Sequence, residues 1–206
     1  MKRLFDIVTG LLLLCVFCPI MLGVAILVRV KIGSPILFKQ ERVGYHERIF
    51  TLYKFRTMTN QKDEAGKDLS DSVRLTKIGL LLRRLSMDEL PQLLNVVKGD
   101  MSLVGPRPLL VRYLPYYTPE ERKRHLVRPG ITGYAQVEGR NQLDWSSRFK
   151  LDVIYVEKLS FLLDLRIIFK TISKTLKREG IADVPDQQML DFDVERMMKA
   201  SIQKVE

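Results

Sequence analysis

One uninterrupted apolar run near the N-terminus constrains this chain more than any other feature. No charged residue occurs between Asp6 and Arg29. A straight helix over this run would measure about 33 Å, which is enough to cross a hydrocarbon core of about 30 Å. A secretory signal is a poorer interpretation, because no small-residue cleavage site follows the run and basic residues do. The run therefore predicts a membrane helix.

Pro19 lies inside the run and divides it into pieces roughly 18 and 14 Å long. Proline removes one backbone donor and disfavours helical geometry at the preceding residue, Cys18. Basic residues flank both ends of the run, so the positive-inside rule gives no clear direction of crossing. These features fit a helix that enters the membrane, bends and leaves on the same face. Prolines are also tolerated in spanning helices, so the residues alone leave re-entry and spanning equally open.

The charge balance indicates an anionic partner. The 206 residues carry a formal net charge of +10, which suits nucleic acid, an anionic membrane face or a phosphorylated substrate. The length suits one domain with a sizeable core. Cys15 and Cys18 have the spacing of a metal or redox pair, but no second cysteine pair exists and the only histidines are His46 and His125. A zinc site is therefore not expected, and a reduced compartment fits the chain best.

The remaining patterns predict a chain of the α/β class that is mostly helical. Two β-prone runs at 34–44 and 48–58 predict a small hairpin. The basic amphipathic stretch 73–85 is either an interfacial membrane helix or a helix that packs on the core. Periodicity predicts helices at 144–158 and 160–178, and no structure is predicted for the polar residues beyond 180. A short helix is expected from Pro91 to Val97, ended by Gly99.

Asp88 and Glu89 stand side by side just before Pro91. One interpretation is a capping box, because Ser86 and Glu89 match the S-x-x-E pattern. Pro91 would then lie beyond the first turn, where it interrupts the hydrogen-bond ladder. The other interpretation places Pro91 at the first helical position, which leaves both carboxylates free to face a ligand. Spacing alone leaves both interpretations open.

Arginines in turn-rich loops favour the second interpretation. Arg107 lies between two prolines that restrict its backbone, and Arg128 and Arg140 lie in the stretch RPGITGYAQVEGRN. A planar guanidinium suits phosphate, and a free helix N-terminus also favours an anion. Carboxylates among such arginines are metal ligands or nucleophiles, since otherwise they would only repel the substrate. Mg²⁺ takes one or two carboxylates together with substrate phosphates, so the residues predict phosphoryl chemistry with Mg²⁺.

At this point the sequence resembles a known family, the bacterial sugar transferases. More narrowly, it resembles the small monotopic phosphoglycosyl transferases that consist of the catalytic domain alone. The resemblance rests on the membrane run with its central proline and on the motifs YKFRTM, SMDELPQLLNVVKGDMSLVGPRPLL, RPGITGYAQVEGRN and FLLDLRI. It runs in order from about Lys2 to Gly180 and does not cover the polar tail.

The resemblance implies an enzyme that transfers a phosphosugar from a UDP-sugar to polyprenyl phosphate and releases UMP, as the first membrane step of glycan assembly. It implies a location at the bacterial inner membrane, among its lipids, with the catalytic domain on the cytoplasmic face. It also favours re-entry over spanning at Cys18 and Pro19. The expected segments are a re-entrant helix-break-helix at 1–32, a membrane-associated catalytic domain with amphipathic interfacial helices at 33–180, and a polar tail at 181–206. The motif GRN suggests an N-acetylated sugar.

The family's motifs also assign roles to residues. Asp88 would be the nucleophile on the sugar-linked phosphorus, and Glu89 would help to hold Mg²⁺. The resemblance implies substrate-binding roles for Arg56, Arg107, Arg128 and Arg140. One departure is Cys18, since many members have a serine whose hydroxyl can satisfy a backbone carbonyl at the bend. A cysteine S–H is a weak donor, so the bend should rest on Pro19 alone and be less rigid.

Two other classes of function are alternatives for a basic chain that carries an apolar run. A nucleic-acid binder would also be basic, but the chain has neither an aromatic and basic face like that of an RNA-recognition sheet nor a zinc-finger spacing. A non-catalytic membrane scaffold is the other alternative, and release of UMP from UDP-sugars separates it from the enzyme. The residues do not define an oligomeric state.

Overall fold

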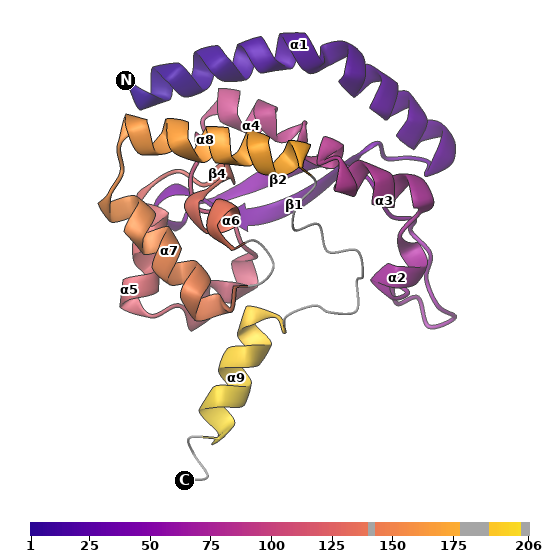
Figure 1. Ribbon diagram of the computed structural model, residues 1–206. Coiled ribbons are helices and arrows are strands. Elements are labelled where there is room, and N and C mark those ends of the chain that lie inside the picture. The colour runs from indigo at the N-terminus through magenta and orange to yellow at the C-terminus, as the bar shows by residue number, and fades with distance from the viewer. Residues whose placement is uncertain (140–142, 178–189, 203–206) are drawn as a thin grey trace. The chain divides into compact units, whose positions relative to one another are not determined.

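The computed structural model describes residues 1–139, 143–177 and 190–202, which form mostly helices with four short strands (Figure 1). The prediction of a mostly helical chain with a small β-hairpin is confirmed. The chain divides into two compact units, unit 1 (1–40 and 51–103) and unit 2 (41–50 and 104–206). The elements are α1 (Lys2–Lys31), β1 (Leu37–Val43), η1 (Tyr45–Glu47), β2 (Ile49–Phe55), α2 (Asp71–Arg74), α3 (Lys77–Arg84), η2 (Met87–Glu89), α4 (Gln92–Lys98), β3 (Ser102–Val104), η3 (Val111–Tyr116), α5 (Pro119–Arg122), η4 (Lys123–Leu126), β4 (Gly130–Thr132), α6 (Tyr134–Glu138), α7 (Trp145–Glu157), α8 (Phe161–Leu176) and α9 (Phe192–Ile202), where η marks a 3₁₀ helix.

The apolar run forms the long helix α1. It is a single helix with Pro19 inside it, and its ribbon curves rather than running straight (Figure 1). The expected separation into two helices at Cys18 and Pro19 is therefore wrong as a statement about secondary structure. An interior proline costs one backbone hydrogen bond and clashes with the carbonyl one turn earlier, and a long helix can absorb both by bending.

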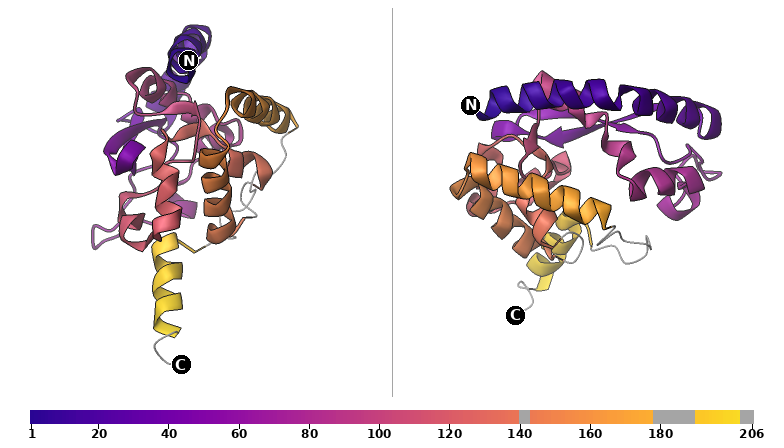
Figure 2. Two further views of the ribbon diagram at one scale, coloured as in Figure 1. Left: turned by 90° about the vertical axis from the view of Figure 1, so that its left-hand side faces the viewer. Right: turned by 45° about the horizontal axis from the view of Figure 1, so that its top comes forward.

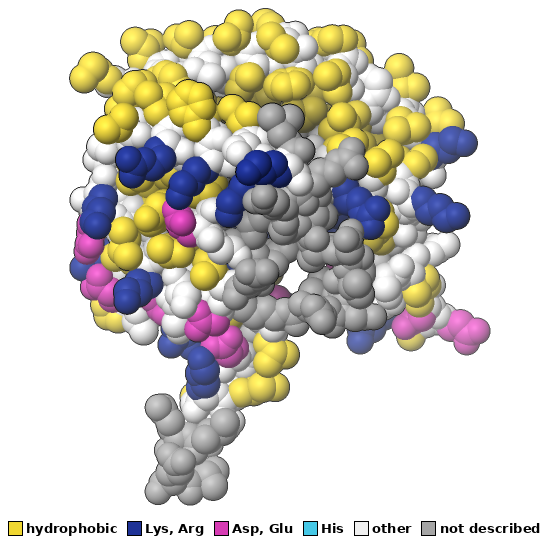
Figure 3. All heavy atoms as spheres, viewed as in Figure 1, with side chains coloured by type: hydrophobic (Ala, Val, Ile, Leu, Met, Phe, Trp, Pro, Cys, Tyr) yellow, Lys and Arg dark blue, Asp and Glu magenta, His cyan; other side chains and the backbone are white. Residues whose placement is uncertain are grey.

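Most of the α1 surface is apolar and uncovered. Only 11% of its most apolar window is buried, so α1 is not the core helix of a soluble protein, and it is long and apolar enough to cross a membrane. Hydrophobic side chains gather over α1 in the space-filling view (Figure 3). Apolar surface of this extent on one helix fits a lipid environment.

Both halves of α1 are attached to unit 1. In the first half, Arg3 donates to the carbonyls of Val96 and Val97 at the end of α4, at 2.6 and 2.9 Å. The buried carboxylate of Asp6 accepts from the Ser102 hydroxyl at 2.8 Å and from the Leu103 N–H at 3.1 Å. Helix α1 consequently runs beside α4 (Figure 1 and Figure 2).

The second half of α1 packs on an apolar cluster of unit 1. Val24 and Val28 lie against Phe55 of β2 and Leu82 of α3, and all four side chains are buried. Helix α3 therefore packs on the core through Leu82, while Leu81 on the same helix is exposed. The structure thus supports the core-packing interpretation of the amphipathic stretch for part of this helix.

Unit 2 is built around an aromatic cluster. The cluster comprises Leu109, Tyr113, Tyr117, Trp145, Phe149 and Phe192, all buried, and its rings meet at centroid distances of 4.9–5.6 Å. Edge-to-face ring pairs of this kind add stability beyond the area that they bury. Helices α7 and α8 form where periodicity predicts them, and the side chains of Asp144 and Ser160 cap their N-termini.

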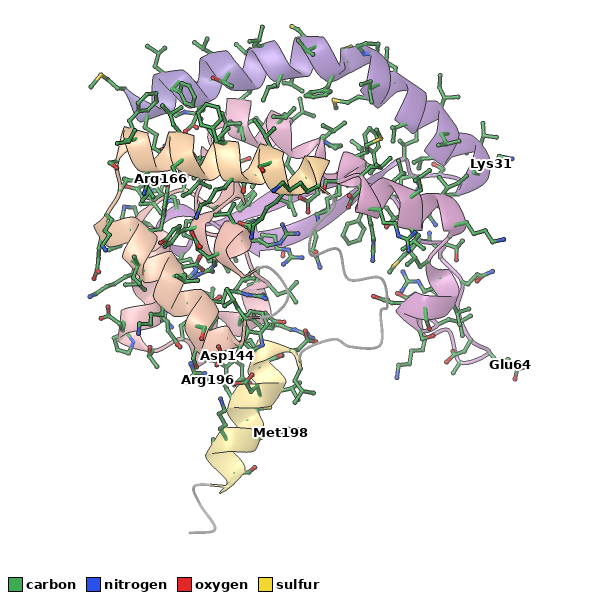
Figure 4. The ribbon with its side chains drawn as sticks, in the orientation of Figure 1. Lys31, Glu64, Asp144, Arg166, Arg196 and Met198 are labelled. Atoms are coloured by element: carbon green, nitrogen blue, oxygen red, sulfur yellow. The ribbon has the colours of Figure 1, made fainter. Side chains whose placement is uncertain are left out.

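Helix α9 was not predicted. The tail beyond residue 180 contains an ordered helix whose first residue, Phe192, has 0% exposure in the aromatic cluster. Polar contacts also secure this segment: the Trp145 indole N–H donates to the Leu190 carbonyl at 2.8 Å, the Tyr113 hydroxyl donates to Asp191 at 2.8 Å, and Arg196 pairs with Glu121. Arg196 and Met198 both lie on α9, and Met198 is exposed (Figure 4). The polar composition misled the prediction, because one aromatic anchor and charge pairs hold the helix rather than an apolar stripe.

Candidate active site

Asp88 and Glu89 lie in η2, the tight turn directly before α4. Ser86 precedes this turn with φ 53°, in the left-handed region, and its side chain makes no capping hydrogen bond. The capping-box interpretation is therefore wrong, since Ser86 does not accept from a backbone N–H of the turn. Pro91 is the N-cap residue of α4 and leaves the two carboxylates ahead of the helix, as the second interpretation expects.

A lysine joins the two carboxylates. Lys54, on β2, places its ammonium nitrogen 2.7 Å from Glu89 Oε1 and 4.0 Å from Asp88 Oδ2. The Asp88 residue is 7% exposed, and the side chains of Lys54 and Glu89 are 20% and 18% exposed. Two neighbouring carboxylates with little exposure repel each other, and Lys54 places a positive charge beside both.

Sequence reasoning missed Lys54, although the YKFRTM motif contains it. The sequence feature that could have indicated Lys54 is its position as the one charged residue in the largely apolar strand IFTLYKF, where an ammonium group needs a partner. The partner could not be named from the sequence, because Lys54 and Glu89 are 35 positions apart.

Asn95 fixes α4 against β2. Its amide oxygen accepts from the Tyr53 N–H at 3.2 Å, and its amide nitrogen donates to the Thr51 carbonyl at 2.7 Å. The side chain thus bonds the β2 backbone as a neighbouring strand would, and it is fully buried. Because Tyr53 adjoins Lys54, this contact holds the lysine in register with the turn that carries the carboxylates.

Arg56 lies close by in sequence but is engaged with the backbone. Its guanidinium donates to the Ser34 carbonyl at 2.6 Å and to the Met58 carbonyl at 2.8 Å, and the residue is 8% exposed. These contacts join the segments on either side of the hairpin. A role for Arg56 in substrate binding remains a prediction.

Arg107 and Arg128 belong to unit 2. Arg107 is half-buried between two buried prolines and lines a shallow surface hollow with residues 43–44, 124–125, 127 and 129. The Arg128 guanidinium lies over the Tyr45 ring, 5.3 Å from its centroid. Arg140, the fourth predicted arginine, lies outside the described residues. The structure therefore assigns Asp88, Glu89 and Arg56 to unit 1, and Arg107 and Arg128 to unit 2.

His125, which also lines the hollow, is a buried histidine whose ring nitrogens lack hydrogen-bond partners among the described residues. The residue is 5% exposed. Burial, and after it the nearby guanidinium groups of Arg124 and Arg122, together lower the pKa of His125 from 6.5 to about 3. The ring is therefore neutral at physiological pH.

A magnesium site would need few protein ligands. Among the described residues, no group of three or more His, Cys, Asp or Glu side chains could hold a metal ion. Mg²⁺ bound chiefly by substrate phosphates requires only one or two carboxylates. Asp88 and Glu89 place two carboxylates in one turn, which is the number of protein carboxylates that such an ion takes.

Comparisons with known proteins identify similar chains. Residues 1–178 match the family described as bacterial sugar transferase. A Bacillus subtilis protein named "Uncharacterized sugar transferase EpsL" is 58% identical over 181 residues, which cover 88% of this chain and 90% of that protein.

Two longer relatives carry more specific names. The "UDP-N-acetylgalactosamine-undecaprenyl-phosphate N-acetylgalactosaminephosphotransferase" of Aeromonas hydrophila is 39% identical over 191 residues, which cover 87% of this chain and 44% of that protein. The "Undecaprenyl-phosphate galactose phosphotransferase" of Salmonella typhimurium is 37% identical over 197 residues, which cover 87% of this chain and 41% of that protein. The chain spans less than half the length of these two relatives.

Proposed function

Because this chain belongs to the bacterial sugar transferase family, we propose that it transfers a phosphosugar from a UDP-sugar to polyprenyl phosphate. The products would be UMP and a polyprenyl diphosphate sugar, the first membrane intermediate of glycan assembly. The relatives from Aeromonas hydrophila and Salmonella typhimurium, whose names specify undecaprenyl phosphate as acceptor, support this reaction. An N-acetylated sugar is the donor that we propose to test first.

The observation that carries the proposal is the carboxylate pair at the start of α4, ion-paired to Lys54. Asp88 would attack the phosphorus that bears the sugar, forming a bond from its carboxylate oxygen and breaking the bond to the UMP oxygen. UMP would leave with the electrons of that bond. A phosphate oxygen of the polyprenyl acceptor would then attack the same phosphorus and release the Asp88 carboxylate.

Two steps suit substrates that are both anionic. Direct displacement would bring a diphosphate and a phosphate together, whereas a covalent aspartyl intermediate lets UMP depart before the second anion enters. Lys54 would place a positive charge beside both carboxylates, and Arg107 and Arg128 would bind the phosphates of the donor. Mg²⁺, held by Glu89, would add positive charge beside the phosphate.

We further propose that the enzyme is monotopic and lies on the cytoplasmic face of the inner membrane. The attachment of both halves of α1 to unit 1 supports re-entry, because a spanning helix would carry one half away from that unit. Helix α8 would lie in the interface, since Phe161, Leu162 and Phe169 are exposed beside basic residues such as Arg166 (Figure 4).

Single cysteines would test the topology. In a variant that lacks Cys15 and Cys18, a cysteine at position 2 and one at position 190 should be equally protected from an impermeant thiol reagent in whole cells. A cysteine engineered in a periplasmic protein is the positive control for labelling. Labelling at one end only would mean that α1 spans the membrane.

The reaction itself is tested by stoichiometry. UDP-sugar alone should release close to one UMP per active enzyme, and mass spectrometry should find a phosphosugar adduct on Asp88. Asp88→Asn should abolish both signals while the protein stays folded, and Asp63→Asn, in an exposed loop, is the matched control. UMP that appears only with polyprenyl phosphate, without an adduct, would refute the covalent intermediate in favour of direct displacement. Failure to release UMP from any UDP-sugar would refute the proposed reaction.

A further inference from the structure

The loop Pro106–Arg107–Pro108 has few backbone N–H groups with which to form hydrogen bonds to the rest of unit 2. Its two prolines have no N–H, so the loop can be fixed to the rest of unit 2 mainly through its carbonyl groups. The structure supplies a donor for each. The Gly130 N–H donates to Pro106 O at 3.0 Å, Arg124 to Arg107 O at 2.7 Å and Arg42 to Pro108 O at 3.3 Å.

Arg124 is the strongest of these anchors. It makes the shortest of the three contacts, it carries a charge, and its side chain is 1% exposed. The buried Gly130 N–H is a neutral donor and Arg42 is only partly buried, whereas Arg124 is both charged and buried, which favours the strongest bond. Its acceptor is the carbonyl of Arg107 itself, the residue whose guanidinium must be aimed.

Asp152, on α7, holds Arg124 in this position. Its Oδ2 accepts from Arg124 Nε at 3.0 Å and from Arg124 Nη2 at 2.9 Å. Arg124 Nη2 carries two protons, so it donates to Asp152 and to Arg107 O at the same time. The Tyr117 hydroxyl lies 3.4 Å from Nη1, and the guanidinium lies over the Phe149 ring at 5.5 Å.

The pair is ionised. Burial acts to lower the pKa of Arg124, but the Asp152 carboxylate holds it above the ordinary value. Burial also raises the pKa of Asp152, although Arg124 acts to lower it. The raised pKa of Arg124 favours a charged guanidinium, whereas the raised pKa of Asp152 favours a neutral carboxyl group. We take the charged state, because the guanidinium keeps its proton at any practical pH and two of its N–H groups point at one carboxylate oxygen.

We infer that Arg124 and Asp152 are positioning residues that fix the Arg107 backbone, so that the Arg107 guanidinium meets the phosphates of the nucleotide-sugar donor. The inference rests on the proposed function, since it needs Arg107 to bind that donor. Stability alone does not account for the pair, because a buried ion pair is on balance no more stabilising than apolar residues of similar volume. The contact to Arg107 O is what such apolar residues would lack.

The test replaces the pair in the full chain with apolar residues, as Arg124→Met with Asp152→Leu. Because the two charges leave together, neither is stranded, and the melting temperature should fall only modestly, since the Arg107 carbonyl loses this donor. The donor KM should rise and kcat/KM for UMP release should fall about tenfold. The double variant Lys199→Met with Glu195→Leu removes another ion pair of unit 2, on α9, and should leave both constants unchanged.

A double-mutant cycle identifies the route of the effect. In an Arg107→Ala background, replacing the pair should cost less than about a further twofold in kcat/KM, because Arg107 is no longer there to be aimed. If the replacement does not fold, Arg124→Lys takes its place, since one ammonium retains the charge but lacks the fork that reaches both acceptors.

The outcomes separate the two proposals. An active wild type whose folded pair variant keeps normal kinetics would overturn the positioning role and leave the reaction standing. An equal loss in the Arg107→Ala background would also overturn it, because the pair would then act by another route. A wild type that releases no UMP would overturn the proposed function, and the positioning role with it.

Discussion

His125 should make unit 2 lose stability in mild acid. Its pKa is about 3 in the folded chain, because burial and then Arg124 and Arg122 oppose the charged form, against an ordinary value of 6.5. Between these values the unfolded chain binds a proton that the folded chain does not. Stability is therefore fully present above pH 6.5 and falls as the pH falls toward 3.

The magnitude follows from proton linkage. Each unit of pH within this window costs up to about 1.4 kcal/mol, and the step from about pH 7 to about pH 5.5 costs about 1 kcal/mol. This interval lies well above the folded pKa, so the result depends almost entirely on the unfolded value. For a chain of this size, about 1 kcal/mol corresponds to about 2–4 °C in melting temperature.

His125→Phe isolates this contribution. Phenylalanine keeps an aromatic ring against Tyr117, whose ring lies 5.2 Å away, and it loses no hydrogen bond because both histidine nitrogens lack one. Melting curves of the purified, detergent-solubilised protein at the two pH values should show a larger acid-induced drop for the wild type, by about 2–4 °C. Carboxylates titrate alike in both proteins and cancel in the difference. Equal pH dependence in the two proteins would refute the buried, neutral histidine.

Three further substitutions test the site and the fold. Arg107→Ala should lower kcat/KM at least about tenfold with little change in melting temperature, and a large fall in melting temperature with normal kinetics would assign Arg107 to folding. Lys54→Met should slow UMP release at least about tenfold, because Asp88 and Glu89 would lose the positive charge of Lys54. The control Lys39→Met, on the exposed part of β1, should leave the rate of UMP release unchanged. Phe192→Ala should cost about 3–5 kcal/mol of unfolding free energy in denaturant titrations, while Met198→Ala should cost less than about 0.5 kcal/mol.

Local sequence signals predicted much of the fold. Pro91 and Gly99 bound α4 as expected, and Gly99 takes φ 101°, a conformation that glycine adopts without strain. Asp144 and Ser160 cap the two long helices that periodicity predicts. In each of these cases the physical cause lies within one turn of the residue concerned.

Features that depend on distant partners were not predictable. Lys54 became part of the candidate site only through Glu89, and Arg56 proved to bond the backbone on both sides of the hairpin. Helix α9 has a polar sequence, and its stability comes from Phe192 entering a cluster built by residues far earlier in the chain. At Pro19 a local signal was given too much weight. Proline predicts a break in the helix, but α1 continues through Pro19 as one curved helix.

The position of Phe192 also sets an order of events during synthesis. The rings of Tyr113, Tyr117, Trp145 and Phe149 all leave the ribosome well before it, yet their cluster is complete only when Phe192 arrives. At about 5–20 residues per second, about 2–9 s separate the emergence of Phe149 and Phe192. Through this interval the aromatic cluster lacks Phe192, while residues 1–103, which carry Asp88 and Glu89, have already been synthesised. Unit 2 thus completes its core only after translation has passed residue 192, well beyond the family match that ends at residue 178.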